Sequence, residues 1–366
     1  MNVYKPFAVT VTGSSHTKHG KDCQDSSYKY ENTEVSIAAV ADGHGDDNCF
    51  RSAKGAAFAV ICAIDGIFRF VEYHKEKFTP GLFKKKHIPL RDDFNQPLHD
   101  IVKHIIAQWQ IEVEKDYTAF PFTAEELEKV DEKHRKKYET DSHINKAYGT
   151  TLIASAITSR YWLSIHIGDG RLTALYPDGS FDQPVPWDKK CFLNATTSIC
   201  DDDAFERARC YFSLNTEKSL PAAVFLCTDG IDDNYPVDGN EKHLFKLYRT
   251  IALTFAEDGF ESTCEQLKAL ANSFATKGKG DDTSIAGFIN MEALKQTVPV
   301  LQKQIAEEEN LHREAEPETV EPKVCIAHNI EEANAAYKKQ VDSAKNGNIY
   351  EYGSFLQINK PLETDK

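Results

Sequence analysis

The sequence lacks several features that define large functional classes. Its longest apolar run, residues 55–64, is about half of the ~20 residues that a membrane-spanning helix needs, so we expect no membrane segment. The nine cysteines include no Cys-x-x-Cys pair, which argues against a zinc knuckle and a disulfide framework. Free thiols, together with a first segment that has no long apolar core, predict a cytoplasmic protein.

Excess positive charge is also absent. The chain has 43 basic and 57 acidic residues and a formal net charge of -14, which excludes the basic face expected of a nucleic-acid-binding protein. Neither Gly-x-Gly-x-x-Gly after a first strand nor Gly-x-x-x-x-Gly-Lys-Ser/Thr occurs, which argues against dinucleotide and P-loop functions. The Cys-x5-Arg loop of the cysteine phosphatases is missing as well. A net acidic chain does suit a protein that collects divalent cations.

The apolar patterning predicts many short strands mixed with long helices, which favours the α+β class over a doubly wound sheet. A pair of strands, 161–167 and 171–176, is expected to form a hairpin around Gly168-Asp-Gly170. The other strands are predicted at residues 7–12, 35–41, 150–158, 222–227 and 283–289. Helices are predicted at residues 52–70, 99–114, 242–256 and 262–276.

Composition divides the chain into a core domain and a charged tail. We predict one domain over residues 1–290, in which residues 71–146 form either a helical insertion or lid, or a plain helical layer over a sheet. Within that segment, Thr123-Ala-Glu-Glu126 is a capping box that opens a charged helix. Residues 291–366 are predicted to be a charged helical tail with a linker, including a solvated helix that runs from 307 towards 321 and an amphipathic helix at 329–345.

Aspartates stand at the ends of the strands that are predicted to be buried. Asp42 and Asp229 each follow an apolar run, Asp281 precedes another, Asp25 lies between the first two strands and Asp169 lies at the predicted hairpin tip. A single Asp-Gly is usually only a turn, but several carboxylates can converge on one edge of a sheet. Like charges there raise one another's pKa unless a cation compensates, and an oxygen-rich site suits Mg²⁺ or Mn²⁺. Two such metals activate a bridging water for phosphate-ester hydrolysis.

Five motifs in order resemble those of the metal-dependent protein serine/threonine phosphatases of type 2C. They are Asp42-Gly-His-Gly45, Tyr148-Gly-Thr-Thr151, Ile167-Gly-Asp-Gly-Arg171, Thr228-Asp-Gly230 and Gly280-Asp-Asp-Thr-Ser284. The opening His16-x-x-x-Gly20 and Cys23-Gln-Asp25 are similar to the divergent bacterial branch of that family. The resemblance covers about residues 8–290 and implies a four-layer αββα sandwich, in which helices flank two antiparallel sheets and the metals lie at one edge.

The resemblance also implies a role for each acidic residue. Asp42 would bridge two Mn²⁺ or Mg²⁺ ions, with the carbonyl of Gly43 on the second ion. Asp229 and Asp281 would complete the first ion's ligands, and Asp282 ranks below Asp281 because the family usually has Asn there. Asp25 would serve the second ion, through water, and Asp169 a weaker third ion.

The catalytic residues implied by the resemblance are Asp42 and His44, the latter as general acid for the leaving alkoxide. Gly20 stands where eukaryotic members carry an Arg that grips the phosphate, so Lys18, His19 or Lys21 is the candidate replacement, with Lys21 first. Lys lacks the two-pronged geometry of Arg. Gln24 replaces a common Glu ligand, which weakens the expected hold on the second ion.

The leading hypothesis is a metal-dependent phosphomonoesterase that removes phosphate from phosphoserine or phosphothreonine in proteins, by attack of a metal-bridged hydroxide. Its partners would be phosphoproteins and a serine/threonine kinase, with no nucleic acid and no membrane. One alternative is a weakly active or inactive signalling or scaffold module that keeps the phosphatase fold, favoured by the missing Arg and the long insertion. Another is a metal phosphodiesterase or nuclease, which the acidic charge argues against.

Overall fold

The computed structural model describes residues 2–75, 87–89, 96–140, 142–186, 188, 191, 196–215, 218–236 and 239–315. The chain divides into two compact units, Met1–Ala306 and Glu307–Lys366. Of the second unit only the first few residues are described, so the predicted helix at 329–345 lies outside the described residues. No helix in the described part is both long and apolar enough to cross a bilayer.

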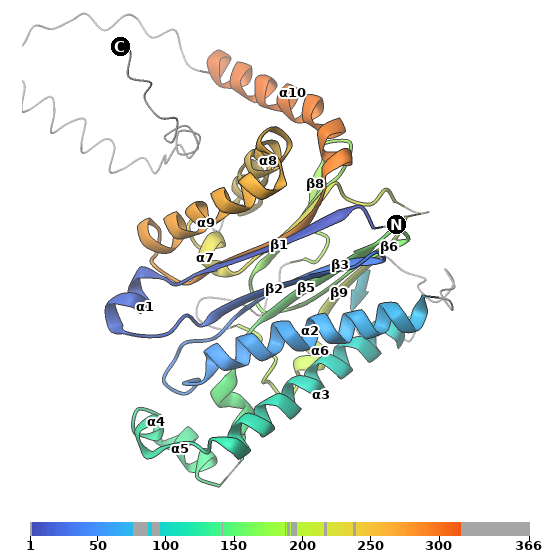
Figure 1. Cartoon of the computed structure of the whole chain (residues 1–366). Coiled ribbons are helices and arrows are strands. Elements are labelled where there is room, and N and C mark those ends of the chain that lie inside the picture. Colours follow the sequence, from blue (N-terminus) through green and yellow to red (C-terminus); the bar gives the residue numbers. More distant parts are fainter. Residues whose placement is uncertain are drawn as a thin grey trace, which may run out of the picture. The chain divides into compact units, whose positions relative to one another are not determined.

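Two antiparallel sheets face each other at the centre of the first unit (Figure 1). The five-stranded sheet has the order β1-β11-β10-β7-β8, with β1 at Tyr4–Val11, β11 at Thr283–Asn290, β10 at Ala223–Cys227, β7 at Arg171–Leu175 and β8 at Phe181–Asp182. The six-stranded sheet has the order β2-β3-β5-β6-β9-β4, with β2 at Asp25–Glu31, β3 at Val35–Asp42, β5 at Leu152–Thr158, β6 at Tyr161–Ile167, β9 at Arg209–Leu214 and β4 at His87–Pro89.

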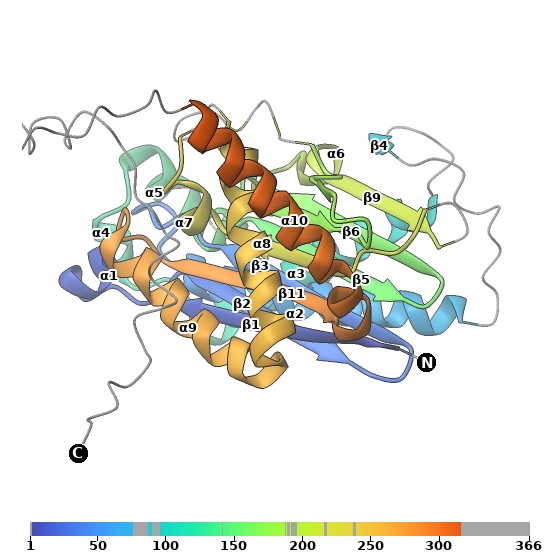
Figure 2. The same ribbon diagram turned by 90° about the horizontal axis from the view of Figure 1, so that it is seen from above.

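Helices cover the outer face of each sheet. The helices α8 (Asn240–Asp258) and α9 (Phe260–Lys277) lie over the five-stranded sheet, as the view from above shows (Figure 2). The helices α2 (Ser52–His74) and α3 (Gln96–Ala119) lie on the opposite side of the sandwich (Figure 1). The predicted αββα sandwich of the α+β class is therefore confirmed. Apart from α10 (Met291–Ala315), the remaining described helices are short: α1 (Ser14–His19), α4 (Ala124–Glu128), α5 (Glu132–Tyr138), the 3-10 helix η3 (Ile144–Tyr148), α6 (Ala204–Arg207) and α7 (Asp229–Asp232).

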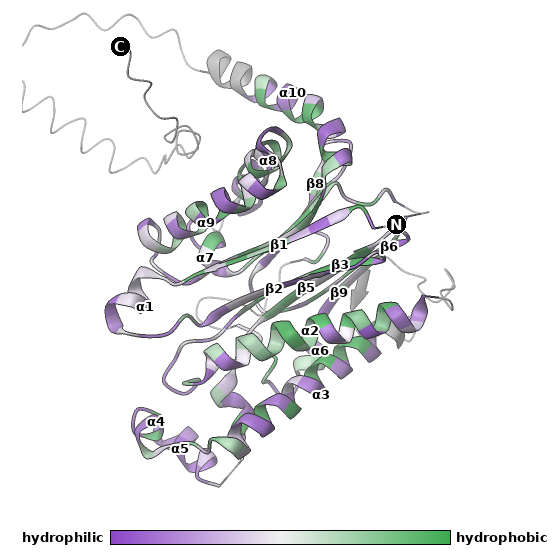
Figure 3. Cartoon of the chain, viewed as in Figure 1, coloured by the Kyte–Doolittle hydropathy of each residue, from purple (hydrophilic) through white to green (hydrophobic). Residues whose placement is uncertain are grey.

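The core lies in layers because both faces of the central strands are buried. All residues of β5, β6 and β10 are buried, and apolar residues dominate these strands (Figure 3). Val40, Trp162 and Phe288 belong to the cluster between the sheets, whereas Ile37 and Trp109 belong to the cluster that α2 and α3 share with the six-stranded sheet. Removing this much apolar surface from water is the main stabilising contribution of such a fold.

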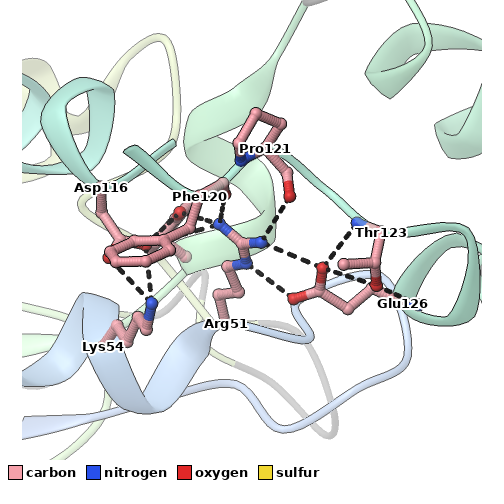
Figure 4. Close-up of polar contacts among 8 residues, drawn as sticks. Arg51, Lys54, Asp116, Phe120, Pro121, Thr123 and Glu126 are labelled. Carbon is pink, nitrogen blue, oxygen red and sulfur yellow. Dashed lines mark hydrogen bonds and ion pairs between the residues drawn. The ribbon is translucent and has the colours of Figure 1, made fainter. Parts of the chain in front are cut away.

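A buried arginine fastens the helical segment between α2 and β5 (Figure 4). Arg51 Nε and Nη2 donate to the carboxylate of Glu126 at 2.7 and 3.0 Å, and Nη1 donates to the carbonyl of Phe120 at 2.7 Å and to the hydroxyl of Tyr148 at 2.8 Å. Asp116 accepts from Tyr148 at 2.7 Å and is paired with Lys54 at 2.8 Å. We name Arg51, Asp116, Glu126 and Tyr148 the Arg51 cluster; it joins α2, α3, α4 and η3.

The capping box at Thr123 is present, since its hydroxyl accepts from the Glu126 amide at 3.2 Å and Glu126 accepts from the Thr123 amide at 2.8 Å. The charged helix that it opens is α4, which ends at Glu128, and α5 begins anew at Glu132 with Asp131 as its cap. The predicted capping box that opens a charged helix is therefore confirmed. The long helix α10 (Met291–Ala315) follows β11 directly, and its Leu294 and Leu301 are buried.

The predicted hairpin of 161–167 and 171–176 is wrong. The strand β6 pairs with β5 and β9, whereas β7 pairs with β10 and β8, so the turn at Gly168-Asp-Gly170 carries the chain from one sheet to the other. Gly168 has φ 111°, which glycine adopts without strain and which allows this sharp change of direction. The strands β2 and β9 were not predicted, and Asp25 accordingly begins a strand instead of lying between two. The helix α9 begins at Phe260, not at Ser262.

Candidate metal centre

Two aspartates from the six-stranded sheet lie opposite each other where the sheet ends. Asp42 is the last residue of β3, Asp25 is the first residue of β2, and the two are register partners. The Tyr148-Gly-Thr-Thr151 motif holds the end of β3 in place. Thr151 Oγ1 accepts from the Asp42 amide at 2.9 Å, and Thr150 Oγ1 donates to the Asp42 carbonyl at 2.9 Å.

The five-stranded sheet contributes two more aspartates at the same end. Asp229 begins α7 two residues after the end of β10, and Asp281 lies two residues before β11, the antiparallel neighbour of β10. Thr228 links the two sheets, because its hydroxyl donates to Asp25 Oδ2 at 2.7 Å and accepts from the Ser284 amide at 3.0 Å. The carboxylates of Asp25 and Asp229 are thereby held at one edge of the sandwich.

Asp169 reaches this edge from the turn between β6 and β7. One carboxylate oxygen each from Asp42, Asp169 and Asp229 lie within 4.8 Å of one another, and we name these three residues the carboxylate cluster. Arg171 does not neutralise the carboxylate of Asp169 by an ion pair. Its Nη1 donates to the main-chain carbonyl of Asp169 at 3.0 Å, and its Nη2 is paired with Asp232 at 2.7 Å.

Burial and mutual repulsion both act on the carboxylate cluster. Burial, followed by the charges of Asp229 and Asp25, raises the pKa of Asp42 well above its usual range. Burial and the charge of Asp169 raise the pKa of Asp229 to about 7. Burial also raises the pKa of Asp169. Burial is the largest cause at all three residues, so each carboxyl binds a proton more tightly than it would in water, although the charge of Arg171 partly opposes the shift at Asp169.

The donor set fits a hard divalent cation. Among the described residues, no Lys, Arg or His comes within ion-pair distance of the carboxylate cluster, whose oxygens are gathered at the edge of two rigid sheets. Carboxylate and carbonyl oxygens without thiol or imidazole are the ligands that Mg²⁺ and Mn²⁺ prefer. A bound cation would replace the missing positive charge and lower the pKa of all three carboxyls.

Asp25 and Asp281, two other predicted ligands, lie near the carboxylate cluster but not within it. Asp25 is 7% exposed and raises the pKa of Asp42 through its charge. The Asp281 side chain is 57% exposed, and its charge raises the pKa of Asp229. Both remain predicted ligands, Asp281 of the first ion and Asp25 of the second.

The neighbouring Asp282 has a different role. Its buried carboxylate accepts from the amides of Gly13 and Gln24, each at 2.6 Å, and lies 2.8 Å from His16 Nδ1. These contacts tie the segment before β2 to the start of β11. Ranking Asp282 below Asp281 as a ligand agrees with this arrangement, since the carboxylate of Asp282 is already occupied by three partners.

His44 follows the end of β3, beside the carboxylate cluster. Its amide donates to the carbonyl of Gly149 at 3.1 Å, and a Cβ at Gly149 would lie 2.7 Å from His44 Cδ2, so only glycine leaves room for the imidazole there. Burial and the nearby charge of Lys146 lower the pKa of His44 to about 4. Gly43, whose carbonyl is a predicted ligand, lies in the same turn and its amide donates to the Gln24 carbonyl at 3.1 Å.

The three candidates for gripping phosphate all lie on or just after α1, and all are exposed. Of these, Lys21 comes closest to the His44 turn, since its Nζ lies 3.4 Å from the carbonyl of Gly45. Lys18 makes no side-chain hydrogen bond in the described structure, and His19 Nδ1 lies 2.7 Å from the carbonyl of Ser15 in its own helix.

Lys146, which the sequence analysis did not single out, is close enough to His44 for its positive charge to lower the pKa of the imidazole. The signal in the sequence was its place two residues before Tyr148-Gly-Thr-Thr151, a motif that packs against the end of β3.

The family model of protein phosphatase 2C matches residues 12–271 of the chain, which contain four of the five motifs and all of the carboxylate cluster. Solved structures are similar at low identity. One is the catalytic domain of the serine/threonine phosphatase PstP, solved with two manganese ions, which is 14% identical in sequence and has a TM-score of 0.45. The match covers 78% of this chain and 97% of the PstP chain. Stp1 from Staphylococcus aureus is 15% identical, with a TM-score of 0.43 and coverages of 78% and 94%.

RsbX, solved with magnesium, is 14% identical, with a TM-score of 0.38 and coverages of 78% and 95%. No curated protein matches the chain. The family match spans the whole six-stranded sheet and the strands β10, β7 and β8 of the five-stranded sheet, and the motifs that it includes build the edge where the carboxylate cluster lies. The chain belongs to the protein phosphatase 2C family.

Proposed function

We propose that this protein is a metal-dependent phosphomonoesterase that removes phosphate from phosphoserine or phosphothreonine in proteins. The carboxylate cluster carries the proposal, because three partly buried acidic groups with no ion-pair partner among the described residues are costly unless metal ions bind there. The match to the protein phosphatase 2C family supports the choice of substrate class. A serine/threonine kinase that makes the phosphoprotein, and the cytoplasm as compartment, belong to the same proposal.

In this proposal Asp42 would be a ligand of two ions, the Gly43 carbonyl and Asp25 would serve the second, and Asp229 and Asp281 would serve the first. Asp169 would hold a third, weaker ion. Bound Mn²⁺ or Mg²⁺ would supply positive charge for the phosphoryl oxygens and activate water for attack on phosphorus. The protein's own contribution is to hold these oxygens in place, through Thr150 and Thr151 under Asp42 and through Thr228 beside Asp25.

His44 is proposed to protonate the leaving oxygen. Its pKa of about 4 means that the neutral imidazole predominates at neutral pH, so the protonated form would have to be restored by the negative charge of a bound phosphate. Lys21 is proposed to bind that phosphate, because its Nζ lies next to the turn that carries His44. Loss of His44 should therefore mainly lower kcat, whereas loss of Lys21 should mainly raise KM.

Hydrolysis assays on the full chain test the proposal. The wild type should release phosphate from a phosphoserine peptide when Mn²⁺ is present and lose this activity in excess EDTA, with recovery when Mn²⁺ is restored. A phosphodiester substrate, tested in parallel, should not be cleaved. Activity that persists after the metal content is shown to be negligible would contradict the metal-dependent mechanism. A metal-loaded, folded protein without phosphatase activity would favour the scaffold alternative.

A further inference from the structure

A polar cavity of about 250 Å³ lies outside the carboxylate cluster. Four basic side chains line it: His134 and Lys137 from α5, His143 just before η3, and Lys146 within η3. We name it the basic cavity. Asp201 and Asp202 also line it, so the charges of the two lysines and the two aspartates balance formally, in a chain whose formal net charge is -14.

The basic cavity shares a wall with the turn that carries His44. Cys200 lines the basic cavity, and a Cβ at Gly149 would lie 3.2 Å from Cys200 Sγ and 2.7 Å from His44 Cδ2. The amide of Gly149 donates to the carbonyl of Lys146 at 3.2 Å, and the carbonyl of Gly149 accepts from His44. A peptide bound with its phosphorylated residue at His44 can therefore place a neighbouring side chain in the basic cavity.

The two lysines of the basic cavity are available to a ligand. Neither the Lys137 nor the Lys146 ammonium group has a hydrogen bond or ion pair with any residue that the structure describes, although Lys146 is only partly exposed. Two other lysines of the same region are already paired. Lys136 is paired with Glu132 at 2.6 Å and Lys54 with Asp116 at 2.8 Å. A partly buried ammonium without a partner is stabilised when an anion binds.

The acidic residues at the basic cavity have partners outside it in part. Asp201 accepts from the Ser198 amide at 2.9 Å and lies 3.8 Å from Arg207 Nη1. His134 is paired with Asp131 at 2.7 Å, and the charges of Asp201 and Asp46 act on Lys146 from a distance. Lys137 and Lys146 nevertheless have no direct ion pair with a described residue, which leaves both ammonium groups open to an added anion.

The walls of the basic cavity are held in a fixed position. Tyr138, at the end of α5, donates to the carbonyl of Asn48 at 2.7 Å, and the Asp131 amide donates to Asn48 Oδ1 at 3.2 Å. His143 has φ 61°, the left-handed region, and no other non-glycine residue in the described part of the chain has a positive φ. Such a conformation costs free energy and is most often kept where it serves a site.

We infer that the basic cavity is a subsite for an anionic side chain of the phosphoprotein substrate, a carboxylate or a second phosphate that lies close to the phosphorylated residue. This inference rests on the proposed phosphatase function and adds a preference among substrates. Lys137 and Lys146 would form ion pairs with the anion, and the position of η3 against the His44 turn would set the distance between the two groups.

The test compares peptides that differ only in one neighbouring residue. The parent is a phosphoserine peptide with alanine at the surrounding positions, and in each test peptide one alanine becomes glutamate or a second phosphoserine. The wild type with Mn²⁺ should show a kcat/KM about fivefold higher for the best anionic peptide than for the parent, as expected for two partly exposed ion pairs. This preference should fall as salt rises. The better of the two anions identifies the natural one.

Lys137→Gln and Lys146→Gln should each reduce the preference, and the double variant should abolish it. Lys133→Gln is the matched control, because Lys133 lies on α5 but does not line the basic cavity, and it should keep the wild-type preference. No preference in the wild type, or a preference that survives in the double variant, would overturn the inference.

Failure of the proposed function would be recognised separately, as a folded, metal-loaded wild type that hydrolyses no peptide. The basic cavity would then be tested by fluorescence anisotropy with the same labelled anionic peptide. Binding that Lys137→Gln and Lys146→Gln weaken, and Lys133→Gln does not, would still support it. Binding equal in all four proteins would overturn it.

Discussion

Two groups of buried charges in this protein are built in opposite ways. In the Arg51 cluster, the guanidinium is 7% exposed, yet hydrogen bonds to Glu126, to Tyr148 and to main-chain carbonyls satisfy it from several sides (Figure 4). In the carboxylate cluster, Asp42, Asp169 and Asp229 face one another with no cation among the described residues. Buried charge that is fully paired serves structure, whereas buried charge left unpaired is prepared for a ligand.

The electrostatic consequences differ in the same way. Hydrogen bonds from Arg51 lower the pKa of Glu126 despite the opposing effect of its partial burial, so the charged form is favoured. Burial and like charges raise the pKa of Asp42 and of Asp229, so the charged form is opposed. Each variant below removes a polar side chain from one of the two clusters or from the residues beside them.

Asp229→Asn should have the largest effect. It removes a ligand charge while keeping the size of the side chain, and the loss of a metal's stabilisation of the transition state should lower kcat/KM at least a few hundredfold. Steady-state hydrolysis of a phosphopeptide in saturating Mn²⁺ measures this. Asp233→Asn is the matched control, because Asp233 is exposed and paired with Lys279 at 2.9 Å. Near-wild-type activity of Asp229→Asn would remove the carboxylate cluster from the mechanism.

His44→Ala should lower kcat by roughly 10²–10⁴, the range for loss of a general acid, and leave Mn²⁺ affinity nearly unchanged. The loss should be greater for a phosphoserine peptide than for nitrophenyl phosphate, whose leaving group needs little protonation. Parallel assays on both substrates, with metal binding followed by calorimetry, give the answer. If both rates fall equally, His44 positions the turn and does not transfer a proton.

Arg51→Met should break the hydrogen bonds that Arg51 makes in the Arg51 cluster and leave the carboxylate cluster unchanged. It removes the cationic partner of Glu126, whereas Asp116 keeps Lys54 and Tyr148, and we expect the free energy of unfolding to fall by about 2–3 kcal/mol, less than for a fully buried pair. Glu126 keeps 29% exposure, which reduces the penalty. Denaturant unfolding monitored by circular dichroism measures the change. The exposed Arg69, paired with Asp65, provides the comparison: Arg69→Met should have little effect.

The stability of the metal-free protein should fall as pH rises between about 4 and about 7. The pKa of Asp229 is raised from 3.8 to about 7 in the folded state, so in this interval the folded protein holds a proton that the unfolded chain has lost. That favours folding at the acidic end, and the advantage disappears as pH passes 7. Thermal unfolding in EDTA at several pH values measures this, and Asp229→Asn should flatten the dependence. Added Mn²⁺ should stabilise most above pH 7, because it competes with protons for the same oxygens.

Lys21→Ala should have the smallest effect, a rise in KM of a few-fold at unchanged kcat, as expected for a contact made equally before and during reaction. The effect should shrink at high salt because Lys21 is exposed. Lys18→Ala and His19→Ala, on the neighbouring α1, provide the reference. If none of the three variants changes KM by more than about twofold, ~0.4 kcal/mol, the phosphate is held by other groups.

The local pattern of the sequence determined which segments are buried strands and which aspartates end them. The apolar runs before Asp42 and Asp229 predicted β3 and β10 within a residue or two, because a strand buried on both faces must be apolar throughout. The capping box at Thr123 was likewise predictable, since it depends on residues only three positions apart. Order and spacing of the motifs were enough to indicate the fold and the metal-binding character of the site.

Pairing between distant strands was decided only by the tertiary structure. The alternation in β6 and β7 is the same whether they pair with each other or with strands of two different sheets, so the predicted hairpin failed. The surroundings of the charged residues were likewise decided only by the tertiary structure. Asp281 and Asp282 are adjacent in sequence, yet one is exposed near the carboxylate cluster and the other is enclosed by Gly13, Gln24 and His16. Whether a carboxylate is paired or left for a metal depends on which remote groups the fold brings within reach.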